Sequence, residues 1–425
     1  MYQKITNYFQ HISRYFSASL IPMLISLLTN PLIALNMSPD DYAITGYYGS
    51  FTHLLTPLIL FYTVNFYNQR YFRVSSEERI RLKATIVRFL IYISAIIALV
   101  SLVGVWGYIK IFNSESSLPI FPYLGLSIFA IPLTGIYALT LNECKLQRDS
   151  KKFFRISVSN GILGIVLSLL FVVVFKDGAR GKLLATLLVN LCFFIWCIWY
   201  NRECFKVKFE TTILTDTLKF CWPLTIAAML GFFTSGYDKI LLEKLGDIQE
   251  LGYYVVGAQF AGYLQIFTSA IQATFQPDIY ENIAKKNARK TALYVLVMLG
   301  AISGVVFAFY IAAPWVVDIL TAGRYIESVT YSRILAIANI TSTAYFASSQ
   351  ITIALGKTRV TLLNKSLCTI LIILMFNIMV ANYGFIGAAW GTVISNIILL
   401  VLNVSLLFIS LKIQNKNGIK NTSNR

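Results

Sequence analysis

Long uninterrupted runs of apolar residues are the feature that most constrains this chain. They recur along the whole sequence and are each long enough to cross a lipid bilayer as a helix. Backbone groups inside the hydrocarbon must be satisfied within the spanning element, which permits only helices or a closed barrel. Barrel strands are segments of roughly 10 residues with alternating hydrophobicity, which these runs do not resemble. We therefore predict an all-α, polytopic membrane protein.

The composition agrees with this prediction. Only 13% of the 425 residues are charged and 57% are hydrophobic, whereas soluble proteins carry about 25% charged residues. That much apolar sequence fills about twelve helices of roughly 20 residues each. The predicted spans are residues 14–36, 43–65, 84–109, 119–142, 156–175, 181–200, 218–242, 252–275, 291–320, 328–355, 361–381 and 386–411.

Basic residues are divided unequally between alternate loops. An even number of spans places both termini on one side, and that side receives 28 of the 36 Lys and Arg residues. Acidic residues are almost evenly divided, so nearly all of the net charge of +17 lies on one face. Cytoplasmic loops carry this kind of excess, and we predict cytoplasmic N- and C-termini. Because topology explains the charge, we expect no nucleic-acid partner.

The two halves of the chain share short sequence similarities. Residues 177–190 match residues 383–396, with Gly178 aligned to Gly384 and Gly181 to Gly387, and residues 38–43 match residues 247–252. We predict two six-helix lobes related by a pseudo-twofold axis along the membrane normal, as in parallel-repeat transporters. The expected limits are 1–206 for the first lobe, 207–217 for a cytoplasmic linker, 218–411 for the second lobe and 412–425 for a cytoplasmic tail.

Basic side chains inside spans are the first candidates for binding a substrate, because ionisable residues are rare in membrane helices and mark function. Arg14, Arg88 and Arg333 lie within predicted spans, and Lys219 lies at the start of the seventh. These four are the candidate substrate-binding residues. The alternative for these residues is that they serve topology or extend to the membrane interface, as long basic side chains do.

An adjacent acid and base form a second candidate. Asp238 and Lys239 lie late in the seventh predicted span. We expect them to neutralise each other, with a role in ion coupling or in holding the lobe together. The neighbouring Glu243 and Asp247 are expected at the surface.

Two prolines, Pro22 and Pro31, lie within the first span. Proline removes a backbone hydrogen bond and can kink a helix, and broken helices line cavities in transporters. We predict a hinge in this span, with simple adjustment of helix shape as the alternative.

Metal, cofactor and catalytic sites are not expected. The six cysteines include no Cys-x-x-Cys spacing, and the two histidines, His11 and His53, are far apart. The loops are short and contain no phosphate-binding loop pattern. The sequence therefore predicts neither an extramembrane enzyme domain nor catalytic residues.

Three segments carry a resemblance to a known family. They are residues 35–51 (LNMSPDDYAITGYYGSF), residues 236–262 (GYDKILLEKLGDIQELGYYVVGAQFAG) and residues 356–396, which end in NYGFIGAAWGTVISN. In order and spacing they resemble the polysaccharide flippases of the multidrug/oligosaccharidyl-lipid/polysaccharide exporter superfamily, most closely the O-antigen flippases. Ala43 stands where the family has glycine, and Lys239 where it has arginine.

The resemblance implies two lobes around a central cavity that opens alternately to each side of the bacterial inner membrane. The implied cargo is an undecaprenyl-diphosphate-linked oligosaccharide, with no chemical reaction. A diphosphate cannot cross hydrocarbon without replacement partners, and arginine can bond two of its oxygens at once. Besides the bilayer, an ion gradient and polysaccharide polymerase machinery are candidate partners.

Two other classes of function remain open. A multidrug or small-cation efflux transporter of the same superfamily needs acidic residues deep in the N-terminal half, whereas the acids there lie in loops or at span ends. A membrane enzyme such as a polymerase or glycosyltransferase needs long loops or external acidic groups.

Overall fold

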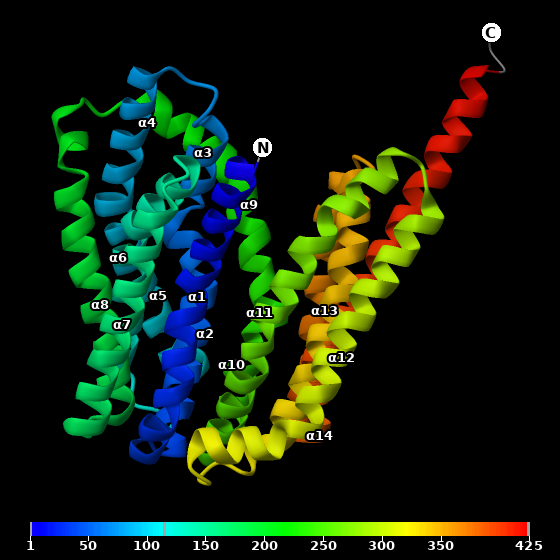
Figure 1. Cartoon of the computed structure of the whole chain (residues 1–425). Coiled ribbons are helices and arrows are strands. Elements are labelled where there is room, and N and C mark those ends of the chain that lie inside the picture. Colours follow the sequence, from blue (N-terminus) through cyan, green and yellow to red (C-terminus); the bar gives the residue numbers. More distant parts are fainter. Residues whose placement is uncertain (1, 114–115, 423–425) are drawn as a thin grey trace. The chain divides into compact units, whose positions relative to one another are not determined.

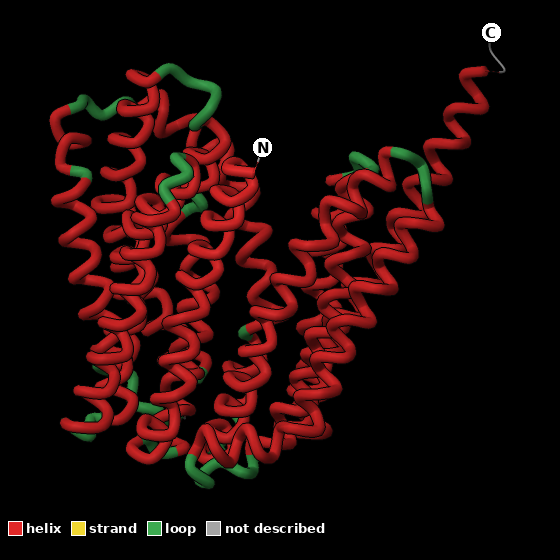
Figure 2. Tube along the Cα trace, viewed as in Figure 1, coloured by secondary structure: helices red, strands yellow, loops and turns green. Residues whose placement is uncertain are grey.

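The chain folds entirely as helices in its described parts (Figure 1, Figure 2). In this computed structural model the described residues are 2–113 and 116–422, and the described side chains leave out residues 2–16, Ser19, Thr358 and those after Lys412. Within these ranges every regular element is a helix. The predicted all-α class is confirmed.

The N-terminal half contains eight α-helices joined by short turns, with one 3₁₀ and two π segments. They are α1 (Tyr2–Asn36), α2 (Pro39–Leu60), α3 (Thr63–Arg70), α4 (Ser76–Arg88), the π segment η1 (Phe89–Ile93), α5 (Ser94–Phe112), α6 (Tyr123–Leu146), α7 (Ser150–Ser168), the π segment η2 (Leu169–Val174), α8 (Gly178–Tyr200) and the 3₁₀ helix η3 (Arg202–Lys206).

The C-terminal half contains longer helices. They are α9 (Thr211–Ser235), α10 (Tyr237–Glu243), α11 (Ile248–Ala284), α12 (Ala288–Thr321), α13 (Ser328–Ala354) and α14 (Thr358–Thr422). The last of these bends at Gly384, whose φ of 54° and ψ of −133° are not helical. The bend separates the two spans expected at 361–381 and 386–411.

Each of the twelve predicted spans coincides with one helix, with a run of consecutive helices, or with one part of α14. Seven helices or helix runs in the described residues are long and apolar enough to cross a membrane by themselves, and one of these seven contains the last two spans. The polytopic membrane fold is therefore confirmed.

The helices α11 and α13 do not meet that apolar criterion because they pack against each other through polar side chains. The donor–acceptor pairs are Thr268–Asn339 at 3.2 Å, Gln272–Thr343 at 3.3 Å, Gln276–Gln350 at 3.0 Å and Tyr280–Gln350 at 2.9 Å. Hydrogen bonds of this kind hold membrane helices together. The polar seam lowers the hydropathy of both helices.

The contacts divide the chain into two compact units. Unit 1 comprises Met1–Met229 with Ile319–Arg324, and unit 2 comprises Leu230–Asp318 with Tyr325–Arg425. The division falls inside α9 and near the end of α12. The lobe limits expected from the sequence, with a linker at 207–217, stay a prediction.

The sequence repeat has a matching backbone geometry. Gly178 and Gly384 both have positive φ, at 46° and 54°. Three residues later, a Cβ on Gly181 would lie 2.9 Å from the carbonyl oxygen of Phe171, and one on Gly387 would lie 2.1 Å from that of Met379. Each half therefore needs its first glycine for a left-handed backbone and its second for close packing on the preceding helix.

The second predicted span is broken where the sequence gives little warning. Phe61 and Tyr62 have φ of 51° and 50°, which ends α2 and begins α3. Left-handed backbone is rare for bulky residues. The thiol of Cys221 on α9 donates to the Tyr62 carbonyl at 3.4 Å, so the break is tied to another helix of unit 1.

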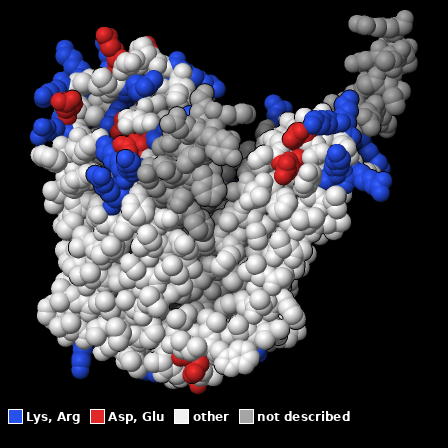
Figure 3. Space-filling model, viewed as in Figure 1, with Lys and Arg blue, Asp and Glu red and all other residues white. Residues whose placement is uncertain are grey.

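Basic side chains gather at one end of each unit. Figure 3 shows Lys and Arg at the end of unit 1 where α3 and α4 lie, and at the end of unit 2 where α11 meets α12, with few at the opposite ends. Both are the ends that the loop charges predict to be cytoplasmic.

Candidate functional site

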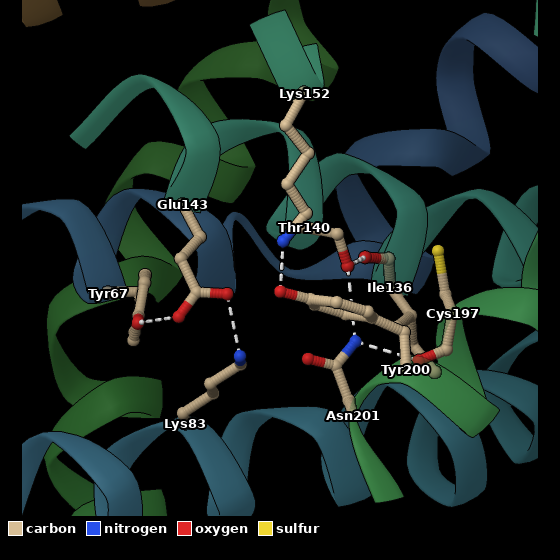
Figure 4. Close-up of polar contacts among 9 residues, drawn as sticks. All are labelled: Tyr67, Lys83, Ile136, Thr140, Glu143, Lys152, Cys197, Tyr200 and Asn201. Carbon is tan, nitrogen blue, oxygen red and sulfur yellow. Dashed lines mark hydrogen bonds and ion pairs between the residues drawn. The ribbon is translucent and has the colours of Figure 1, made fainter. Parts of the chain in front are cut away.

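A partly buried ion pair forms the centre of the candidate site in unit 1 (Figure 4). Lys83 on α4 contacts Glu143 near the end of α6, with Nζ 2.6 Å from Oε2 and side chains that are 16% and 12% exposed. The Tyr67 hydroxyl on α3 donates to the other carboxylate oxygen at 3.3 Å. Burial, together with the Glu143 carboxylate, raises the pKa of the Tyr67 phenol, which therefore remains a donor.

Polar groups of α6 and α8 continue the cluster (Figure 4). The amide of Asn201 donates to Thr140 Oγ1 at 3.2 Å and to the Cys197 carbonyl at 2.8 Å. Thr140 and Glu143 lie on one face of α6, because residues three apart are neighbours on a helix. Asn201 Oδ1 is buried and has no hydrogen-bond partner among the described residues.

A second lysine reaches the cluster from α7. Lys152 Nζ donates to the Tyr200 hydroxyl and lies 3.9 Å from the centre of its ring. Lys83 Nζ lies 6.0 Å from the same ring centre. Two ammonium groups thus lie against one aromatic ring, which favours cations through its π face.

This cluster joins the predicted cytoplasmic ends of the helices in unit 1. Its charges are paired and partly desolvated, so removing one partner of the Lys83–Glu143 pair would cost about 3–5 kcal/mol. No group of three His, Cys, Asp or Glu side chains in the described part of the chain could hold a metal ion. The arrangement is suited to holding helices together and to responding to a change of charge.

Arg88 contacts the segment that follows α8. Its Nη2 donates to the carbonyls of Phe205 at 3.0 Å and Val207 at 2.5 Å. Its Nη1 is buried without a hydrogen-bond partner in the described residues. The guanidinium therefore anchors the start of the expected linker and keeps one nitrogen uncommitted.

Lys219 is exposed on α9. It lies at an apolar cavity of about 440 Å³ whose lining also includes Phe61, Phe89 and Trp222. Phe89 follows Arg88 in the chain. The structure therefore brings the two predicted binding residues Arg88 and Lys219 to neighbouring parts of unit 1.

Arg333 belongs to unit 2, and Arg14 carries a side chain outside the described residues. Arg333 Nε donates to the Tyr310 carbonyl at 2.9 Å, and its guanidinium lies 4.9 Å from the centre of the Tyr310 ring. These contacts link α13 to α12 in unit 2. Arg14 lies on α1, but its side chain is outside the described residues.

Asp238 is buried in unit 2 and fully engaged. Its side chain accepts a hydrogen bond from the Tyr254 hydroxyl at 2.6 Å and lies 3.3 Å from Lys239 Nζ. The predicted contact between the acid and the base is thus present. It lies on the short helix α10, because the chain leaves α9 at Gly236, and it joins α10 to α11.

The surface position expected for Glu243 is wrong. Glu243 is 5% exposed, as is Asp238. The two residues are separated by somewhat more than one helical turn of α10, and this short helix is largely covered by its neighbours.

The two predicted hinge prolines lie in an uninterrupted helix, since α1 continues through both Pro22 and Pro31. A Cβ on Gly161 of α7 would lie 2.4 Å from the Pro22 side chain. The α1–α7 contact is therefore close at Pro22, and the hinge stays a prediction.

Sequence reasoning missed Lys83 and Tyr67, because Lys83 belongs to a run of basic residues that topology explains. Glu143 carried a signal. A carboxylate that ends an apolar span needs a cation or hydrogen-bond donors nearby, and Lys83 and Tyr67 supply them.

The helices and their apolar spans define a polytopic helical membrane protein. The family model described as "Polysaccharide biosynthesis protein" matches residues 37–330, and the chain belongs to this family. The expectation that this chain belongs to a family of polysaccharide biosynthesis proteins is thus confirmed.

Two curated relatives match part of the chain. "Lsg locus putative protein 1" of Haemophilus influenzae is 23% identical over 278 residues, which is 64% of this chain and 66% of the relative. "Capsular polysaccharide biosynthesis protein CapF" of Staphylococcus aureus is 23% identical over 268 residues, which is 58% of this chain and 65% of the relative. The matches thus span just under two thirds of these relatives.

Solved structures share the fold. The lipid II flippase MurJ in an inward closed conformation aligns with a TM-score of 0.72 and 15% identity, covering 94% of this chain and 87% of MurJ. An inward-facing MATE family multidrug resistance transporter aligns with a TM-score of 0.67 and 14% identity, covering 93% and 99%. These neighbours are transport proteins and not enzymes, in agreement with the expected absence of catalysis.

Proposed function

We propose that the protein flips an undecaprenyl-diphosphate-linked oligosaccharide, such as an O-antigen unit, across the bacterial inner membrane. The observation that carries the proposal is the family match over residues 37–330. The proposed mechanism is alternating access by two lobes, 1–206 and 218–411, with the linker 207–217, the tail 412–425 and both termini in the cytoplasm.

The cargo explains why cationic side chains are needed. A diphosphate and a sugar chain lose their water on entering the protein and require replacement hydrogen bonds. We assign Arg14, Arg88, Lys219 and Arg333 to this task. Arg14, Arg88 and Lys219 belong to the predicted cytoplasmic side, where the cargo is made, and Arg333 to the external side.

The geometry of Arg88 supports its place in this set. One guanidinium nitrogen is committed to the Phe205 and Val207 carbonyls, while Nη1 is buried without a described partner. A phosphate oxygen would satisfy that nitrogen, and charge-assisted bonds of this kind are stronger than neutral ones.

Two carboxylates are the proposed points of coupling to an ion gradient. Protonation of Glu143 would release Lys83, and protonation of Asp238 would weaken its contact with Lys239. Either change alters the contacts between helices of one unit. We propose polysaccharide polymerase machinery as the consumer of the flipped product.

Multidrug or small-cation efflux is the second candidate, because a MATE transporter shares the fold. It is less well supported by the carboxylates of unit 1. Glu143 is paired with Lys83, and Asp41 accepts hydrogen bonds from Ser38 and Ala179, so both are already engaged.

Reconstitution of the full chain in vesicles distinguishes the two candidates. A lipid-linked oligosaccharide is placed in the inner leaflet, and its appearance outside is followed with an added membrane-impermeant lectin. We expect faster appearance than in protein-free vesicles. Extrusion of ethidium without movement of the lipid-linked oligosaccharide would favour the efflux transporter.

A further inference from the structure

A small, partly open cavity whose apolar lining carries several uncharged polar side chains lies within unit 1. It has a volume of about 240 Å³ and is bounded by α2, α6 and α8. Its polar lining residues are Thr52, Thr56, Ser127, Thr134, Thr186 and Asn190. The cavity does not include Lys83, Glu143 or the candidate cationic residues, so the site described above does not account for it.

The threonines turn their protons away from the cavity. The Thr52 hydroxyl donates to the backbone carbonyl of Gly49 at 2.6 Å. In the same way the Thr56 hydroxyl donates to the carbonyl of Thr52 at 2.6 Å, and the Thr186 hydroxyl to that of Lys182 at 3.0 Å. A hydroxyl that donates once still has lone pairs that can accept hydrogen bonds. The lining is thus suited to a ligand that brings hydrogen-bond donors.

One polar group in the lining lacks a partner. Ser127 is 5% exposed, and its Oγ has no hydrogen-bond partner within the described chain. A buried hydroxyl without a hydrogen-bond partner is energetically unfavourable. The Oγ has essentially no exposed surface, so a ligand in the cavity would satisfy it only after the Ser127 side chain turns toward the cavity.

The size of the cavity limits its ligand. Drug-sized ligands occupy sites of roughly 300–1,000 Å³, so about 240 Å³ suits one small ring and not a chain. Gly49 in the wall contributes to the space, since a Cβ built there would meet nothing within 4 Å. None of the described residues that line the cavity is charged, which disfavours an ionic ligand.

We propose that this cavity binds one uncharged sugar ring of the cargo. The proposal rests on the proposed flipping of a lipid-linked oligosaccharide. Sugar hydroxyls supply hydrogen-bond donors for the threonine oxygens, and one of them can satisfy Ser127 once that side chain turns toward the cavity. The cationic residues hold the diphosphate, whereas this cavity distinguishes a carrier that bears a neutral sugar from a bare carrier.

The test compares two probes on the full chain in lipid nanodiscs. The probes are undecaprenyl diphosphate bearing one N-acetylglucosamine and undecaprenyl diphosphate alone, and the readout is the ratio of their Kd values. We expect the native chain to prefer the sugar-bearing carrier by about fivefold, the order expected for one or two net hydrogen bonds. The Gly49→Leu variant fills the cavity and should bring the ratio close to one.

Matched variants keep the test decisive. Gly104→Leu on α5 adds the same side chain where a Cβ also meets nothing within 4 Å, and it should keep the native ratio. If Gly49→Leu fails to fold, the smaller change Thr52→Val with Ser127→Ala should lower the ratio at least about twofold.

The outcomes separate this inference from the proposed function. Normal flipping in vesicles with an unchanged ratio in the cavity variants overturns the sugar subsite alone. A native chain that neither binds nor flips either carrier overturns the proposed function and the subsite with it. Equal binding of both carriers by the native chain also overturns the subsite.

Discussion

Asp41 lies directly against Gly178 at the start of α8. Asp41 Oδ1 accepts a hydrogen bond from the Ala179 N–H at 2.8 Å, and a Cβ built on Gly178 would lie 2.3 Å from the same oxygen. Asp41 also completes the capping box of α2 with Ser38. One carboxylate therefore serves the N-termini of two helices, where the helix dipole favours negative charge.

This contact predicts that Gly178→Ala is destabilising. The added methyl group would collide with the carboxylate, and a φ of 46° is strained for alanine. We expect a loss of about 1–3 kcal/mol, the range for a residue held in an unfavourable backbone conformation. Thermal unfolding in detergent measures it, with Gly104→Ala as the control that should be neutral or slightly stabilising. Equal Tm values for the two variants would contradict this account.

The Lys83–Glu143 pair predicts strong non-additivity. Lys83→Met or Glu143→Met alone leaves an unpaired charge in a partly buried place, and each should cost about 3–5 kcal/mol. The double variant should cost much less than the sum, because no charge is left. Unfolding of the four proteins gives the coupling energy, and additive costs would mean that the pair does not interact.

The fold was largely predictable because hydropathy reports directly on crossing the bilayer. The sequence repeat also corresponds to a shared backbone conformation, since Gly178 and Gly384 both have positive φ. The break at Phe61–Tyr62 was not predictable, because neither residue is a glycine or proline and the conformation depends on packing, including the Cys221 contact.

The candidate site was less predictable. Lys83 and Glu143 are 60 residues apart, and only the fold of unit 1 makes them neighbours. The sequence indicated that Arg88 either binds the substrate or sets the topology. In the structure its side chain also donates hydrogen bonds to backbone carbonyls. Such partners cannot be read from a sequence because carbonyls belong to every residue.

The predicted topology can be tested by cysteine labelling. In a Cys192→Ser background, which removes the one exposed cysteine among the described residues, Ser116→Cys should react with an impermeant maleimide added to intact cells. Lys416→Cys should react only after the membrane is opened. Reaction of Lys416→Cys in intact cells would refute cytoplasmic termini.

Asp238 should matter more than an exposed acid. Asp238→Asn keeps an oxygen for Tyr254 but loses the charge that faces Lys239. We expect slower flipping at equal amounts of folded protein. Glu281→Gln is the control, since that acid pairs with Lys285 at the exposed end of α11. Normal flipping by Asp238→Asn would reduce the pair to a dispensable contact.

The assignment of three arginines to the diphosphate predicts that lysine cannot replace them. Lysine keeps the charge that topology requires but cannot bond two oxygens in the fixed fork of a guanidinium. We expect Arg14→Lys, Arg88→Lys and Arg333→Lys each to slow flipping roughly tenfold, as for the loss of one hydrogen bond to a charged group.

Stability and transport must be measured together to interpret these variants. Arg88→Lys will also lose contact with the Phe205 and Val207 carbonyls, so its Tm should fall as well. If that contact were its whole role, flipping per folded molecule would stay normal while the Tm dropped. Arg155→Lys, on an exposed residue of α7, should leave both unchanged. Full flipping by all three substituted proteins would show that these arginines do not bind the diphosphate and serve only topology and helix packing.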